Sequence, residues 1–170
     1  MSLHAFDALE FCLSLSHAHA RLSLKMDEDL GVFHGLGFGD FVLLHRLGNA
    51  PGGRLAMADL AQALGMTLSA LTRKLLQFEK IGLAARDACL GGDGHRYALI
   101  RPAGRRLMEE AAVTASALCA AAVQRLEPAC VSEIQRAMPA LCIASQPGDQ
   151  AARIARTQNP TCQTTPSPPP

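Results

Sequence analysis

Aromatic side chains and net charge are both scarce in this chain of 170 residues, which has no tryptophan, one tyrosine and a net charge of +1. A charge so close to zero excludes a general electrostatic attraction to nucleic acid, so any such attraction must come from a local group of residues. No apolar run is long enough to span a bilayer, and the N-terminus lacks the pattern of a signal peptide. We therefore expect a cytoplasmic protein with no membrane partner.

Sequence patterns of catalysis are missing as well. There is no nucleophile elbow, no phosphate-binding loop and no pair of carboxylates in an apolar setting. The glycines of Leu90–His95 are too weak a pattern to indicate a phosphate cradle. The six cysteines form no Cys-x-x-Cys pair, which in a cytoplasmic protein indicates thiols rather than a disulfide framework. We expect no enzyme activity and no cofactor.

Alanine and leucine are abundant and dominate a hydrophobic fraction of 49%. This composition favours a mainly α-helical protein whose helices pack against another surface, such as a second copy of the chain. A first helix is predicted over His4–Leu30, where one apolar row runs from Phe6 to Leu24 and a second from Phe11 to Met26. Because the two rows together make a wide apolar face, this helix needs partners on more than one side.

A glycine-rich segment, Gly31–Gly39, is expected to end the first helix. Asp40 is then predicted to cap a second helix that ends at Leu47, with Phe41 and Leu44 facing inward. The turn cluster Asn49–Gly53 follows.

The segment Met57–Gly82 predicts a helix-turn-helix. A short helix is expected to end at Gly65, and Thr67 is placed to cap a second helix over Leu68–Ile81. Its expected inward face is Leu68, Leu71, Leu75 and Phe78, and its other sides carry Ser69, Thr72, Arg73, Lys74, Gln77 and Lys80. An apolar back with hydroxyl and basic residues in front suits a DNA major groove, although an ordinary helical hairpin with a solvated basic face fits the same residues.

The periodicity changes after Gly82. Two short strands, Leu83–Asp87 and Arg96–Arg101, are predicted to form a small β-hairpin, either a wing that lies along DNA or a cover for the helix pair. Pro102 suits the start of a long helix, and a further helix is expected over Val131–Ser145, kinked or shortened by Pro139. The Pro-rich remainder is predicted to be disordered.

In this order the elements resemble the MarR family of winged helix-turn-helix transcriptional regulators, over roughly Ala8–Leu126. The strings that carry the resemblance are GLGFGDFVLLHRLGNAPGGRLAMADLAQALGMTLSALTRKLLQFEKIGL and, after the hairpin, PAGRRL. The resemblance implies a homodimer with an N-terminal dimerisation helix (1–30), a winged helix-turn-helix DNA-binding lobe (31–101), C-terminal dimerisation helices (102–145) and a disordered tail (146–170). It further implies a repressor that binds double-stranded DNA at a pseudo-palindromic operator and is released by a small, aromatic acid effector.

Carried over position by position, the resemblance implies DNA contacts by Thr67, Ser69, Ala70, Thr72, Arg73, Lys74, Gln77, Arg86, His95 and Arg96. The chain departs from the family in two places. Gly92–Gly94 stands where the wing usually has an Asp-Arg-Arg-like run, and Leu76 and Gln77 stand where an acid and a base are usual. Each lost cation removes one phosphate contact, so weaker operator binding is expected.

The effector is expected to bind near His17, Arg21 and His45. His17 lies on the apolar row of the first helix, however, and fits a core or interface position equally well. Cys12, His17, His19 and His34 have no tight metal-ligand spacing, so no metal site is predicted. Cys12 lies roughly where peroxide-sensing members of the family keep a reactive thiol, which leaves a redox-sensing regulator as one alternative. A partner-binding protein with a degenerate winged-helix fold that no longer binds DNA is the other.

Overall fold

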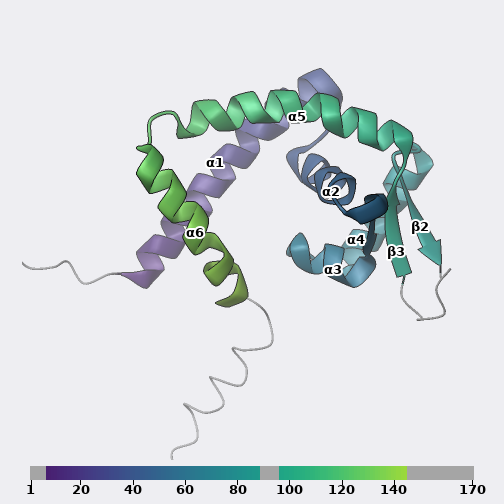
Figure 1. Cartoon of the computed structure of the whole chain (residues 1–170), viewed down its shortest axis with the longest axis horizontal. Helices are drawn as coiled ribbons and strands as arrows, with labels where there is room; N and C mark the ends of the chain where they lie inside the picture. The colour runs from purple at the N-terminus through teal and green to yellow at the C-terminus, as the bar shows by residue number, and fades with distance from the viewer. Residues whose placement is uncertain (1–6, 89–95, 145–170) are drawn as a thin grey trace, which may run out of the picture. The chain divides into compact units, whose positions relative to one another are not determined.

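The computed structural model of the protein describes residues 7–88 and 96–144 (Figure 1). The chain divides into two compact units, Met1–Ala122 and Val123–Pro170. Within the described ranges the elements run α1 (Ala8–His34), α2 (Phe38–Gly48), a 3-10 turn (Pro51–Gly53), β1 (Arg54–Ala56), α3 (Met57–Ala63), α4 (Leu68–Lys80), β2 (Ala84–Ala88), β3 (Arg96–Ile100), α5 (Pro102–Val123) and α6 (Pro128–Ala144). The predicted fold class, mainly α with a small β-hairpin, is confirmed.

Helix α1 begins and ends later than predicted. Its N-cap is Asp7, whose Oδ1 accepts hydrogen bonds from the backbone N–H groups of Leu9 (2.9 Å) and Glu10 (3.2 Å). The expected break at Gly31 is wrong, because the helix continues through it to the left-handed residue Gly35 (φ 64°). A single glycine costs a helix only about 1 kcal/mol, which the full burial of the adjacent Leu30 offsets.

Helix α2 is capped by a different aspartate from the one predicted. Its N-cap residue is Gly37, which supplies no side-chain cap. Instead Asp27, on α1, accepts a hydrogen bond of 2.6 Å from the N–H of Phe38. Asp40 lies inside the first turn of α2, where a negative charge is favoured by the helix dipole. The predicted capping role of Asp40 is therefore wrong.

The helix-turn-helix is present as α3 and α4. Gly65 adopts φ 62°, and the Thr67 hydroxyl accepts a hydrogen bond of 3.2 Å from the N–H of Ala70, which caps α4 as predicted. Leu71, Leu75 and Phe78 are buried. Leu68 is half exposed (51%), because it is the first residue of α4 and the core covers only the later turns.

Three strands form an antiparallel sheet in the order β1-β3-β2. The predicted hairpin of β2 and β3 is confirmed to within one residue, with Ala85 opposite Leu99. Strand β1 was not predicted; it pairs with β3 through Ala56 opposite Tyr97. A strand of three residues beside a turn cluster shows no alternation that could reveal it in the sequence. The Leu90–His95 loop, which contains the Gly92–Gly94 departure, lies outside the described residues.

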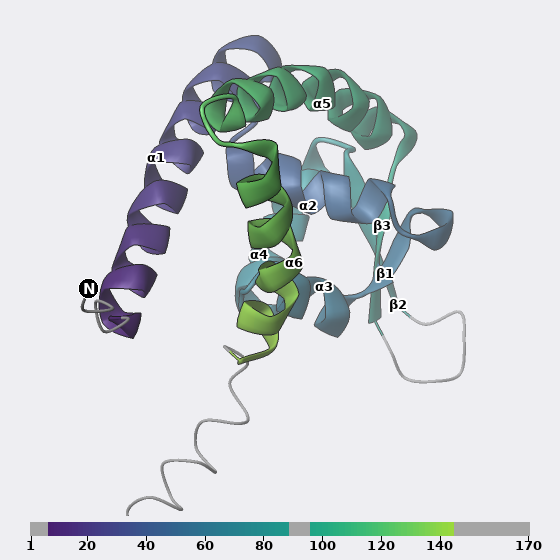
Figure 2. The ribbon, with the colours of Figure 1, turned by 60° about the vertical axis from the view of Figure 1, so that its left-hand side comes forward.

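The core of the first unit is aliphatic, and α5 closes it. The largest fully buried side chains are Met26, Leu30, Leu43, Leu44, Leu47, Leu60, Leu71 and Leu75. Both views show α5 running past α2 (Figures 1 and 2), and the Arg105 Nη1 donates a hydrogen bond of 3.0 Å to the carbonyl of Gly48. Gly104 lies directly against the backbone of Leu83, where a β-carbon would overlap the Leu83 carbonyl. Helix α5 therefore starts at a point of close backbone contact.

Helix α6 belongs to the second unit and starts at Pro128, three residues before its predicted start. It continues past Pro139 to Ala144, so the predicted shortening is wrong. The tail from 146 onward, with Cys162, lies outside the described residues. No helix within 7–88 and 96–144 has the length and apolar character needed to cross a membrane.

Candidate nucleic-acid interface

The outward face of α4 presents a short polar row. Ser69, Arg73 and Gln77, spaced four residues apart, are exposed, and Arg73 makes no ion pair with a described residue. The Thr72 hydroxyl donates to the carbonyl of Leu68 (2.8 Å), which leaves its oxygen lone pairs available as acceptors. A free guanidinium, an amide and hydroxyl groups on one helix face are the groups that read base edges and phosphates in a major groove.

Arg86 is held by α4 at the base of the wing. Its N–H donates to Glu79 Oε1 (2.6 Å), and its guanidinium donates to Glu79 Oε2 from Nη2 (2.8 Å) and Nε (3.1 Å). The side-chain hydrogen bond from Arg86 lowers the pKa of Glu79 below its ordinary value. The same bond raises the pKa of Arg86. Arg86, which the sequence predicts to contact DNA, therefore already joins the wing to α4 through its side chain.

Lys74 also has a partner inside the chain. Its Nζ lies 2.5 Å from Oδ1 of Asp40 in the first turn of α2, and both side chains are less than 40% exposed. The ammonium group therefore points toward α2, whereas Arg73 beside it is exposed to solvent.

A small hollow of about 250 Å³ lies between α4 and the wing, beside the contact of Arg86 with Glu79. Thr72, Arg86 and Arg96 line it together with Met57, Glu79 and Asp87. Tertiary structure thus brings together three predicted contact residues that come from three different elements, α4, β2 and β3. His95 belongs to the loop outside the described residues.

Sequence reasoning missed Arg54, on β1. Its guanidinium carbon lies 3.7 Å from the centroid of the Tyr97 ring, and its Nη2 lies 3.9 Å from Oδ2 of Asp87. The side chain thereby spans from β1 across β3 to β2 and braces the wing. Nothing in the sequence marked it, because its role depends on a strand that was not predicted.

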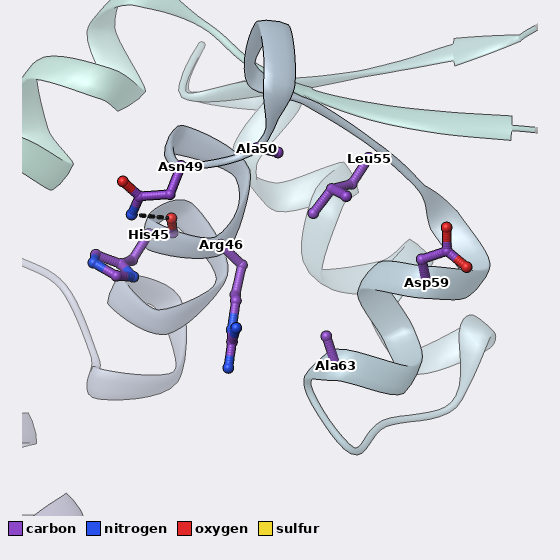
Figure 3. A pocket seen from close by; sticks show the side chains of 7 residues that line it. All are labelled: His45, Arg46, Asn49, Ala50, Leu55, Asp59 and Ala63. Atoms are coloured by element: carbon purple, nitrogen blue, oxygen red, sulfur yellow. Dashed lines mark hydrogen bonds between the residues drawn. The ribbon is translucent and has the colours of Figure 1, made fainter. Parts of the chain in front are cut away.

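Of the predicted effector residues, His45 lines a hollow of about 520 Å³ at the junction of α2, β1 and α3 (Figure 3). Arg46 and Asn49 stand beside it on the α2 side, Asp59 lies on α3, and apolar atoms come from Ala50, Leu55 and Ala63. Figure 3 shows the Asn49 amide bonded to the His45 carbonyl, a contact of 2.9 Å. The site offers three nitrogen-bearing side chains and one carboxylate beside an apolar wall, and the nitrogen-bearing groups suit a small carboxylic acid.

The other predicted control residues lie elsewhere. His17 and Arg21 are exposed on α1 and do not line the hollow beside His45. His34 bonds through Nε2 to the Thr114 hydroxyl on α5 (2.8 Å). Cys12 is an exposed thiol on α1. Within the described ranges, no three His, Cys, Asp or Glu side chains are grouped so that they could hold a metal ion.

The helix pair α3–α4 and the hairpin of β2 and β3 define a winged helix-turn-helix protein. No family model matches the sequence, and no curated protein matches it. Solved structures do match. Sco3205, a MarR family transcriptional regulator from Streptomyces coelicolor determined in complex with DNA, is similar with a TM-score of 0.74 and 24% identity, over 87% of this chain and 94% of that one.

Two further solved structures contain small molecules. The MarR family protein Rv2887 of Mycobacterium tuberculosis, in complex with p-aminosalicylic acid, has a TM-score of 0.58 and 28% identity, over 76% of this chain and 95% of that one. CouR of Rhodococcus jostii RHA1, bound to p-coumaroyl-CoA, has a TM-score of 0.70 and 16% identity, over 82% of this chain and 95% of that one. The chain has the fold of the MarR family of transcriptional regulators, which confirms the resemblance predicted from the sequence.

Proposed function

We propose that the protein is a DNA-binding transcriptional regulator that acts as a homodimer. The observation that carries this proposal is the exposed row of Ser69, Arg73 and Gln77 on α4, beside a wing that Arg86 and Glu79 join to the same helix. The fold is shared with Sco3205, whose structure contains DNA. In the proposed complex α4 enters the major groove, Thr67 and Ala70 approach the backbone, and Arg96 lies along the wing.

Exposed apolar side chains support the homodimer. On α1, Leu9, Leu13 and Leu24 are 67%, 55% and 62% exposed, and on α5 Val113 is 73% exposed. Several large apolar side chains exposed on the same helices favour a surface that another chain covers, and a homodimer places the same face of each copy together. We assign dimerisation to residues 1–30 and 102–145, and DNA binding to residues 31–101.

The proposed effector is a small aromatic acid that relieves repression. The hollow at His45 and Arg46 offers cationic or hydrogen-bonding groups beside the apolar side chain of Leu55. Rv2887 and CouR were solved with p-aminosalicylic acid and with p-coumaroyl-CoA, both of which carry an aromatic ring. A ligand of this class can act only if it binds the DNA-competent and the released conformation with different affinities.

The test is a gel-shift titration against the DNA that flanks the protein's own gene, at 50 mM and 200 mM salt. A regulator shifts a discrete fragment, and its affinity falls steeply between the two salt concentrations. A duplex of the same length and base composition in scrambled order is the control. If no fragment shifts even at 50 mM salt, the proposal is overturned and the interaction-protein alternative gains support.

A further inference from the structure

Lys74 occupies the DNA-facing helix but directs its charge away from the exposed row. Its Nζ lies 2.5 Å from Asp40 Oδ1, and its side chain is 34% exposed. Arg73, the preceding residue, is exposed and makes no ion pair with a described residue. Two adjacent cations on α4 therefore have different surroundings, and only one of them is free to meet a phosphate without giving up an existing partner.

The acceptor of this ion pair lies at the N-terminus of α2. Asp40 is in the first turn, and its N–H bonds to the carbonyl of Gly37 (3.0 Å). Asp27, on α1, accepts a hydrogen bond from Phe38 in the same turn. A β-carbon on Gly37 would lie 3.3 Å from Asp27 Oδ1 and 3.7 Å from Asp40 Oδ2. Two carboxylates thus flank one residue, and Lys74 supplies a compensating cation from α4.

We propose that Lys74 and Asp40 form a tether that holds α4 against α2, so that Lys74 is a positioning residue for DNA binding and not a phosphate contact. This inference rests on the proposed function and corrects the role that the family resemblance implies for Lys74. The tether joins α4, the proposed DNA-reading helix, to the first turn of α2. Asp27 on α1 caps that same turn. The orientation of α4 therefore depends on the arrangement of the two helices before it.

The proposal makes an unusual prediction for Asp40→Asn. Removing a carboxylate near DNA ordinarily strengthens binding, because it removes repulsion from the phosphates. If the tether orients α4, Asp40→Asn instead weakens binding, by about five-fold for a partly exposed ion pair. Lys74→Gln weakens binding by a similar factor. The double variant is no weaker than either single variant, because both substitutions break the same contact.

The salt dependence of binding separates a tether from a phosphate contact. Each phosphate contact contributes about 0.9 to the slope of log affinity against log salt. As a positioning residue, Lys74 leaves this slope unchanged when replaced by glutamine. The matched control is Arg106→Gln, which removes an exposed cation from α5 and leaves affinity close to that of the parent.

The experiment measures the affinity of five proteins for one fluorescent duplex from the region flanking the gene, at four salt concentrations. The proteins are the full chain, Asp40→Asn, Lys74→Gln, the double variant and the control Arg106→Gln. Thermal melting of each variant confirms folding. Affinity unchanged or strengthened in Asp40→Asn, or a slope reduced by about 0.9 in Lys74→Gln, overturns the tether while the proposed function stands. If the parent chain binds no duplex, the proposed function fails and the tether falls with it.

Discussion

Glu79, in the last full turn of α4, accepts three hydrogen bonds from Arg86 at the start of the wing. One comes from the backbone N–H and two from the guanidinium, so the contact fixes both the strand and the side chain. Charge-assisted bonds of this kind are shorter and stronger than neutral ones. The wing and α4 are consequently joined through one carboxylate.

Replacing this carboxylate should lower stability in a pH-dependent way. The pKa of Glu79 in the folded chain is below its ordinary value of 4.5, so its contribution is complete above about pH 4.5 and is lost as the pH falls below that value. Glu79→Gln should lower the free energy of unfolding by about 1 kcal/mol at pH 7, and the difference should shrink at pH 3.5. Urea denaturation at both pH values measures it. The control is Glu110→Gln, at an exposed position of α5; an equal loss there would contradict the assignment.

Gly104→Ala should be strongly destabilising. Its new β-carbon would overlap the carbonyl of Leu83, and backbone cannot give way as a flexible side chain can. We expect a loss of about 3 kcal/mol, the upper end for overpacking, measured as a lower melting temperature. Gly39→Ala is the matched control, since a β-carbon there meets nothing within 4 Å. Equal melting temperatures for the two variants would disprove the close approach of α5.

Arg73→Ala should weaken DNA binding with little effect on folding. Its side chain is exposed and has no ion-pair partner among the described residues, so its loss removes little native packing. We expect about ten-fold weaker binding and a salt slope smaller by about 0.9 if it meets one phosphate. Fluorescence anisotropy titrations at several salt concentrations measure both, with Arg106→Ala on α5 as control. Parent-like affinity of Arg73→Ala would show that α4 is not the reading helix.

The homodimer should depend on the apolar face of α1. Leu9 and Leu13, one helical turn apart, are 67% and 55% exposed in the single chain. The double substitution Leu9→Gln with Leu13→Gln should shift the protein toward monomer, because it removes apolar area from the proposed interface. Sedimentation velocity measures the change. Ile81→Gln, at a 65% exposed position after α4, should leave the assembly intact. A dimer of unchanged strength in the α1 variant would place the interface elsewhere.

Small-acid binding should involve His45 and Arg46. p-Aminosalicylic acid is the probe, since it was found in a structure of the same fold. It should raise the melting temperature of the parent chain, because a ligand that binds only the folded state stabilises it. The double variant His45→Ala with Arg46→Ala should lose this response, and His17→Ala should keep it, because His17 does not line the hollow. A response that disappears in His17→Ala instead would move the site to α1.

Local patterns were predicted most accurately. Gly65, with its left-handed backbone, and Thr67, with its capping hydroxyl, delimit the turn as expected. These features depend on a few neighbouring residues, so the sequence displays them directly. Predictions failed where a distant residue replaced a local one, as when Asp27 supplied the cap of α2 that had been assigned to Asp40.

Helical periodicity, glycine positions and capping hydroxyls act over a few residues, so they were enough to predict the helix-turn-helix, the following hairpin and the polar composition of α4. Which cations of α4 and the wing lack a carboxylate partner depends on how the separate elements pack. Lys74 and Arg86 stand in a basic segment of the sequence, yet each meets a carboxylate, whereas Arg73 remains exposed. Ion pairing depends on distances between side chains from separate elements, and those distances exist only once the helices and the wing have packed.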